Sequence, residues 1–78
     1  MSSDIHTDLP LFSEDEVSSN AILGYFAYQH LPDRLQAVSR RFAVLARHIM
    51  DDCAACPERT VALRKLLECK DAAVRSAL

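Results

Sequence analysis

Hydrophobic residues recur at helical spacing through the middle of the chain. Steps of three and four residues separate Leu35, Val38, Phe42, Leu45 and Ile49. This seam predicts an α-helix from about residue 33 to about residue 52. Pro32 fits its beginning, where a missing backbone N–H costs nothing.

A second apolar stripe follows in the last third of the chain, formed by Leu63, Leu66, Leu67, Val74 and Leu78. It predicts a helix that begins near Pro57 and runs almost to the C-terminus. Pairs such as Arg64–Glu68 and Asp71–Arg75, four residues apart, are expected to support it. The only reversal between the two stripes is residues 54–57, so the two long helices should form an antiparallel hairpin.

A shorter helix is expected before this hairpin. Ser13-Glu14-Asp15-Glu16 has the spacing of a capping box, although Ser18 and Ser19 offer an alternative beginning. The buried face of this helix is predicted at Ala21, Ile22, Tyr25 and Phe26, with Gln29 as its next position. The helix should end near His30, because Leu31 precedes a proline and is disfavoured in the α region.

Composition agrees with an all-α fold. The chain has 78 residues, and its apolar content is mainly Ala, Leu and Val, with one Gly and no Trp. A domain of this size buries only ~60% of the surface that its unfolded chain exposes. We therefore expect a homo-oligomer, in which apolar surface is completed by other copies.

Charge divides the chain into two parts. All nine Lys and Arg residues follow residue 17, whereas five of the eleven acidic residues precede it. Residues 1–17 are therefore predicted to be an acidic, flexible tail, and residues 18–78 to be the folded domain with a net charge of +3. That charge suits a locally held anion but is too weak for a dedicated binder of duplex nucleic acid.

No apolar stretch reaches the ~18–20 residues of a membrane span, and no secretory signal is visible, so a cytoplasmic protein is expected. Three cysteines, Cys53, Cys56 and Cys69, argue against a disulfide framework. Cys53 and Cys56 have the spacing of a metal or redox pair, but a structural zinc site needs four ligands. We expect no metal and no cofactor.

The residues richest in chemistry lie at the corner before the second helix, where Phe26, Tyr28, His30 and Pro32 follow one another closely. Flat rings beside positive charge suit a ligand that is planar and anionic, such as a nucleotide. The alternative is that these aromatics pack the corner. Residues two apart on one helix point about 200° from each other, so one of Phe26 and Tyr28 should be buried and the other exposed.

Two sets of basic residues complete the candidate site. Arg40 and Arg41 lie on the second helix, within a basic stripe beside its seam, where guanidinium groups could bind phosphate. The alternative for this stripe is ion pairing with Asp51, Asp52 or Glu58. Arg59 and Thr60 lie at the beginning of the third helix, where free backbone N–H groups favour anions. An ordinary helix start would look the same.

Catalytic motifs are not found. The chain has no Gly-rich phosphate loop, no Ser/His/Asp set, no His-Glu-x-x-His and no paired carboxylates. The sequence therefore indicates a binding module, not an enzyme.

Three segments together resemble a known family: Phe26-Ala27-Tyr28-Gln29-His30-Leu31-Pro32, then Leu35-Gln36-Ala37-Val38-Ser39-Arg40-Arg41-Phe42, then Pro57-Glu58-Arg59-Thr60-Val61-Ala62-Leu63-Arg64-Lys65-Leu66-Leu67-Glu68. They are similar to the helical-hairpin domain of phage anti-CBASS cyclic-oligonucleotide sponges, a hairpin also related to one in an anti-Thoeris sponge. The resemblance covers about residues 20–78.

The resemblance implies a homo-hexamer in the host cytoplasm that sequesters cyclic di- and trinucleotides, for example of the cGAMP type, without degrading them. It implies that Phe26 and Tyr28 stack on bases, that Arg40 or Arg41 contacts phosphate, and that Arg59 and Thr60 serve another pocket. This chain has Leu31 and Asp33 where the family often has a second Pro or a Lys. A helical oligomerisation or virion-associated structural protein without a nucleotide ligand is the alternative, and a small transcription regulator is a third.

Overall fold

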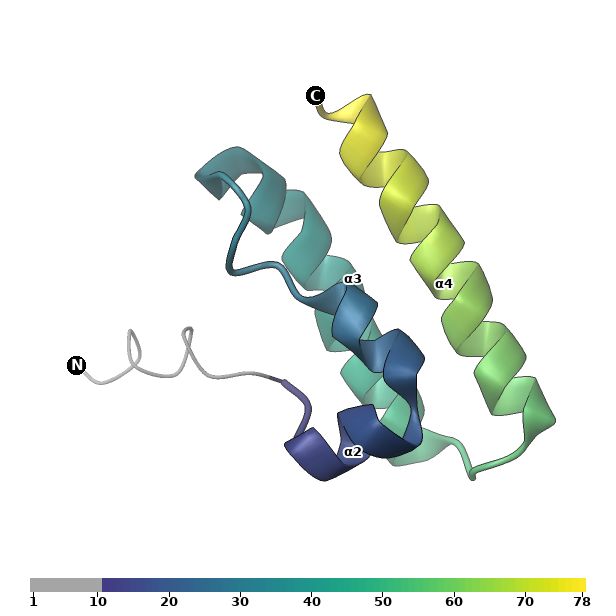
Figure 1. The fold of residues 1–78 in the computed structure, drawn as a ribbon. Helices are drawn as coiled ribbons and strands as arrows, with labels where there is room; N and C mark the ends of the chain where they lie inside the picture. The colour runs from purple at the N-terminus through teal and green to yellow at the C-terminus, as the bar shows by residue number, and fades with distance from the viewer. Residues whose placement is uncertain (1–10) are drawn as a thin grey trace.

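The computed structural model describes residues 11–78, and these form helices joined by short turns (Figure 1). In chain order the elements are α2 (Glu14–Ser19), the 3₁₀-helix η1 (Ala21–Phe26), α3 (Asp33–Asp52) and α4 (Pro57–Ser76). No strand occurs between residues 11 and 78. The prediction of an all-α fold is confirmed for this part of the chain.

The two long helices form the predicted hairpin. α3 and α4 run antiparallel and pack along their length (Figure 1). Pro32 is the N-cap of α3, and Pro57 is the first residue of α4. A proline at either position loses no helical hydrogen bond and cannot extend a preceding helix. These two prolines explain why the first residues of α3 and α4 could be predicted from the sequence.

The segment before the hairpin differs from the single helix that was predicted. It is divided into α2 and η1, and it ends at Phe26 and not near His30. Side chains repeat every three residues in a 3₁₀-helix, so Leu23 and Phe26 share its buried face. Tyr25 lies about 120° away from them and is 67% exposed, which makes its predicted place on the buried face wrong.

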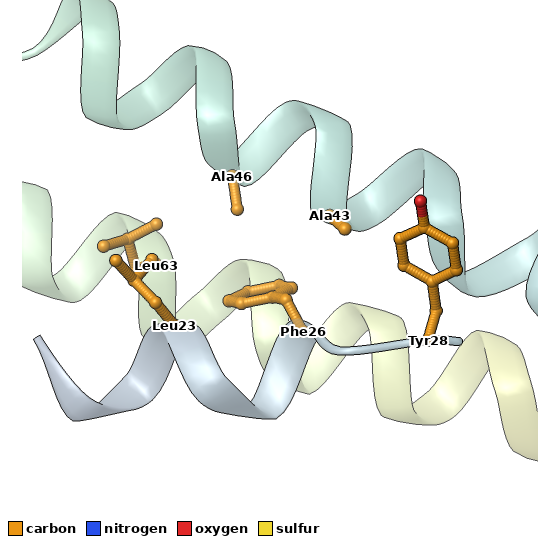
Figure 2. Packing of buried hydrophobic residues seen from close by; sticks show 6 residues of the cluster. All are labelled: Leu23, Phe26, Tyr28, Ala43, Ala46 and Leu63. Atoms are coloured by element: carbon orange, nitrogen blue, oxygen red, sulfur yellow. The ribbon is translucent and has the colours of Figure 1, made fainter. Parts of the chain in front are cut away.

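Phe26 and Tyr28 are both buried, with exposed fractions of 1% and 4%. The expectation that one of them stays exposed assumed that the helix continues through both residues. Ala27 instead has an extended backbone (φ −60°, ψ 139°), which turns Tyr28 back toward α3 (Figure 2). That expectation is wrong because the helix ends between them.

Small side chains on α3 create the space that η1 fills. The buried positions of α3 are Leu35, Ser39, Ala43 and Ala46. Leu23 and Phe26 of η1 pack toward Ala43 and Ala46, with Leu63 of α4 on the same cluster (Figure 2). The buried stripe is therefore rotated from the predicted seam, in which Val38, Phe42 and Ile49 are half-buried and Leu45 is 48% exposed. Ser39 is fully buried, and among residues 11–78 its hydroxyl has no hydrogen-bond partner.

The predicted tail is partly folded. Ser13 and Glu16 form the predicted capping box, in which each side chain accepts a hydrogen bond from the other residue's backbone N–H, at 3.1 and 2.9 Å. Leu11, Phe12 and Val17 pack against the core cluster. Residues 11–17 thus belong to the packed structure, and residues 1–10 of the predicted tail lie outside the described residues.

Arg47 fastens this N-terminal segment to α3. Its guanidinium group donates to both carboxylate oxygens of Glu16, at 2.7 and 2.8 Å, and to Asp51 at 2.8 Å. It also donates to the Leu11 carbonyl at 3.0 Å and lies 5.4 Å from the centre of the Phe12 ring. A two-pronged arginine–carboxylate pair has a defined geometry that a simple charge contact lacks. α2 is consequently held at a fixed place on α3.

We expect this pair to make stability depend on pH. Hydrogen bonds from Arg47 and from the Ser13 N–H lower the pKa of Glu16 from 4.5 to about 2. A carboxyl group whose pKa is lower in the folded state stabilises the fold fully above its unfolded pKa, and this contribution is lost as pH falls toward 2. Glu16→Gln should remove that part of the pH dependence, measured by urea unfolding from neutral pH down to acid.

Glutamine at residue 16 keeps the capping box, so this variant isolates the charge. Glu14→Gln, at an exposed position in the same helix, is the matched control and should keep the wild-type dependence. If Glu16→Gln and wild type lose stability in parallel as pH falls, the ion pair is not what anchors α2.

Candidate functional site

The corner between η1 and α3 is held by hydrogen bonds to its own carbonyl groups. The Leu31 N–H donates to the Tyr28 carbonyl at 3.0 Å. The side-chain amide of Gln36, one turn into α3, donates to the carbonyls of Leu31 and Gln29 at 2.8 and 3.2 Å. With the buried Tyr28 ring on the inner side, these bonds fix the corner so that His30 is presented outward.

A groove of about 350 Å³ lies between this corner and the C-terminal half of α4. Tyr25 and His30 line it from the corner side, and Lys70, Asp71 and Arg75 line it from α4. We call this feature the corner groove. It brings together residues that lie forty or more positions apart in the chain, because the hairpin returns the end of α4 to the beginning of α3 (Figure 1).

The corner groove combines flat rings with cations. The Tyr25 phenol and the His30 imidazole are both exposed and available for stacking. Lys70 has a side chain only 13% exposed, and its ammonium group is 2.9 Å from Asp71. Asp71 therefore offsets one of the two positive charges, while Arg75 is exposed and forms no ion pair within residues 11–78. The groove suits a ligand with a planar ring and a limited number of negative charges.

A second, smaller cavity of about 100 Å³ lies beside the core. Leu11, Phe12, Leu23 and Tyr28 are among its walls, and its lining includes no charged residue. It offers no cationic side chain to a phosphate, so it is a weaker candidate than the corner groove for a phosphate-bearing ligand.

The structure separates the residues predicted at the corner. Phe26 and Tyr28 are part of the core and pack toward α3 (Figure 2). His30 lines the corner groove. Pro32 is exposed as the N-cap of α3. Of these four residues, only His30 therefore lines the corner groove.

The predicted arginines of α3 point in different directions. Arg40 and Arg41 are both exposed, and consecutive helical residues are about 100° apart around the axis. Neither lines the corner groove. For the basic stripe, the alternative of ion pairing holds at Arg47, which binds Asp51, while Arg34 donates to the carbonyl of Ala77 near the end of α4.

Arg59 and Thr60 lie at the other end of the hairpin from the corner groove. Arg59 is half-buried, and its guanidinium group donates to the Cys53 carbonyl at 3.1 Å, which connects the first turn of α4 to the end of α3. Thr60 is exposed. Because α4 has 20 residues, at about 1.5 Å per residue its two ends are roughly 30 Å apart. In one copy, these residues and His30 cannot form a single pocket.

Sequence reasoning missed Tyr25, Lys70 and Arg75. The sequence predicts Tyr25 on the buried face because it assumes the 3.6-residue period of an α-helix, whereas the structure has a 3₁₀-helix there. The spacing of three between Leu23 and Phe26 is the signal that points to the shorter period. The predicted pair Asp71–Arg75 is not formed, since Asp71 binds its neighbour Lys70 and leaves Arg75 free to line the groove.

Comparison with protein-family models, with curated proteins and with solved structures finds no match to this chain. Between residues 11 and 78, no three His, Cys, Asp or Glu side chains gather closely enough to hold a metal ion. The helices in this part of the chain are also not apolar enough over a sufficient length to cross a membrane.

Tyr25 and Phe26 are adjacent in the chain, but Phe26 is buried and Tyr25 is exposed. Replacing each in turn therefore tests the packing directly. Phe26→Ala should lower the free energy of unfolding by ~3–5 kcal/mol, the usual cost of removing a buried aromatic ring. Tyr25→Ala should change it by about 0.5 kcal/mol or less, because an exposed side chain is removed. Urea unfolding followed by circular dichroism measures both. Equal losses in the two variants would contradict the assignment of Tyr25 to the surface.

Proposed function

We propose that the protein binds a nucleotide-class ligand at the corner groove and acts as a sponge that sequesters cyclic di- and trinucleotides without degrading them. The observation that carries the proposal is the grouping of Tyr25, His30, Lys70 and Arg75 around one groove. The rings offer stacking surfaces for a base, and the cations offer partners for a phosphate. The resemblance of residues 20–78 to phage anti-CBASS sponges supports the same ligand class.

We choose the residues that contact the ligand by their exposure in the structure, and not by the sequence motif alone. Phe26 and Tyr28 already fill the core, so stacking by either would require the corner to open. Tyr25 is the aromatic residue that is exposed next to the groove. We therefore assign base stacking to Tyr25 together with His30, and contact with phosphate to Arg75, assisted by Lys70.

Sequestration, in this proposal, takes place in a homo-oligomer, with a hexamer implied by the family resemblance. The groove is not enclosed by the described chain, so a second copy could cover a ligand bound there. Arg40, Arg59 and Thr60 lie away from the corner groove, and any contact that they make with ligand would belong to pockets between copies. The resulting role is to withhold the messenger of a CBASS-type antiphage response in the host cytoplasm.

A structural protein of a phage or prophage without nucleotide ligand is the second candidate. The observation that favours it is Leu45 at the middle of α3, which is 48% exposed and has apolar neighbours on the same side. Contiguous exposed apolar surface, of which Leu45 would be the centre, marks assembly surfaces. Assembly is common to both candidates, and ligand binding distinguishes them.

Isothermal titration calorimetry with a panel of cyclic di- and trinucleotides, with AMP as a linear control, tests the proposal. At least one cyclic nucleotide should bind, and Tyr25→Ala should weaken it by ~1–3 kcal/mol, the range for loss of one stacked base. Arg75→Ala should weaken it by ~1.5–3 kcal/mol through loss of a charge-assisted hydrogen bond. The ligand should be recovered intact after the protein is denatured by heat.

Arg64→Ala is the matched control, because Arg64 is exposed on α4 and does not line the corner groove. It should bind as wild type does. Failure of every cyclic nucleotide to bind would contradict the sponge and favour the structural protein. Binding that survives Tyr25→Ala and Arg75→Ala would place the ligand elsewhere, and a linearised product would show catalysis.

A further inference from the structure

The charges on the walls of the corner groove do not balance. Lys70 and Arg75 bring two positive charges to the groove from α4, and Asp71 brings one negative charge. With His30 neutral, no other residue that lines the groove between residues 11 and 78 is charged. One carboxylate set against two cations leaves the groove with a single positive charge in excess.

Asp71 holds Lys70 in an ion pair. The ammonium nitrogen of Lys70 lies 2.9 Å from a carboxylate oxygen of Asp71, and the two side chains are 13% and 46% exposed. Arg75 has no such partner in the described part of the chain. A pair between Asp71 and Arg75, one turn further along α4, would leave Lys70 unpaired instead. The excess of one cation therefore does not depend on which of the two pairs forms.

The charge of a phosphate group decides how well this excess can offset it. A phosphodiester carries one negative charge, whereas a phosphomonoester carries about 1.5 to 2 near pH 7. The attraction by one unpaired cation grows in proportion to the charge of the phosphate. The cost of removing the phosphate from water grows with the square of that charge. One unpaired cation consequently offsets the first charge of a phosphate group better than the second.

We propose that Asp71 is a specificity-determining residue of the corner groove, which makes the groove accept a phosphodiester in preference to a phosphomonoester. Its carboxylate neutralises Lys70 and repels a second negative charge on the ligand. Arg75 is left to contact the two oxygens that share the single charge of a phosphodiester, which a guanidinium group can bind with two parallel hydrogen bonds. Asp71 thus discriminates between phosphate groups by their charge without bonding to the phosphate.

A carboxylate on the wall of an anion-binding groove weakens the attraction for every phosphate. A groove that had only to attract phosphate would do so more strongly with Lys70 and Arg75 alone. The fold does not depend on Asp71 either, because its side chain is 46% exposed and ion pairs in contact with solvent contribute little to stability. The main effect of Asp71 is therefore on the charge of the ligand that the groove can hold.

This inference rests on the proposed function, because it takes the corner groove as the ligand site and adds the phosphate chemistry that the groove selects. It is tested with mononucleotides, so the selection is measured apart from the sequestration of cyclic di- and trinucleotides. Cyclic nucleotides that bind while mononucleotides show no such selection would contradict this inference alone. Selection among mononucleotides by a protein that binds no cyclic nucleotide would contradict the sponge alone.

AMP and adenosine 5′-methyl phosphate are matched probes, because they share base and sugar but carry a phosphomonoester and a phosphodiester. Isothermal titration calorimetry at pH 8 and low salt compares them, since a phosphomonoester then carries close to two charges and screening is weak. Wild type should bind the methyl ester more tightly than AMP. In Asp71→Asn the affinity for AMP should rise about fivefold relative to the methyl ester, the effect in water of one unit charge about 4 Å away.

Glu68→Gln is the matched control, because it removes a carboxylate that is exposed on α4 and does not line the groove, and it should keep the wild-type preference. Asp71→Glu retains the charge and should also keep it. Circular dichroism should show equal helix content, since aspartate and asparagine have similar helix propensities. Equal changes in affinity for both probes in Asp71→Asn would overturn the proposal, as would a wild type that prefers AMP or binds neither probe.

Discussion

The close approach of η1 to α3 is the contact on which the rest of the structure depends. Ala43 and Ala46 have almost no side chain, and Leu23 and Phe26 fill the space that these alanines leave (Figure 2). Because Phe26 is 1% exposed, most of its apolar surface is removed from water, and burying such a side chain contributes about 1.5–3 kcal/mol. In a chain of this size, with a small core, one such contact is a large part of total stability.

The position of the corner groove also follows from this contact. η1 ends at Phe26, so the chain must pass the end of α4 before α3 begins, and this passage places Tyr25 and His30 beside Lys70 and Arg75. The same contact occupies the side of α3 that carries Ala43 and Ala46, and Leu45, on another side of the helix, is 48% exposed.

The sequence predicted the long helices well and the small elements poorly, for physical reasons. Pro32 and Pro57 mark helix beginnings by their own covalent chemistry, and Ser13 with Glu16 marks a cap through local hydrogen bonds. Such signals act within a few residues. The period of η1 is set by the space on α3, which is a tertiary constraint. The spacing of three between Leu23 and Phe26 is a local sign of that period, but an α-helix allows the same spacing, so the pattern alone predicts an α-helix.

The candidate site shows the same limit. His30 was predicted and does line the groove, but Tyr25 and Arg75 are brought to it only by the return of α4. Arg59 was predicted as a phosphate ligand from its place in the first turn of a helix, yet its guanidinium group binds the Cys53 carbonyl. The sequence thus indicated the residue types of the site, whereas the geometry of the hairpin decided which residues meet.

The most direct measurement of the central claim compares the stability of two variants that add the same side chain to α3. In Ala46→Leu the added side chain falls where η1 packs, and in Ala37→Leu it falls on an exposed side of the helix. Alanine and leucine have similar helix propensities, so packing dominates the difference. In urea unfolding, Ala46→Leu should lose ~1–3 kcal/mol and Ala37→Leu close to none. If Ala46→Leu is as stable as Ala37→Leu, η1 does not rest on the small side of α3, and the account is contradicted.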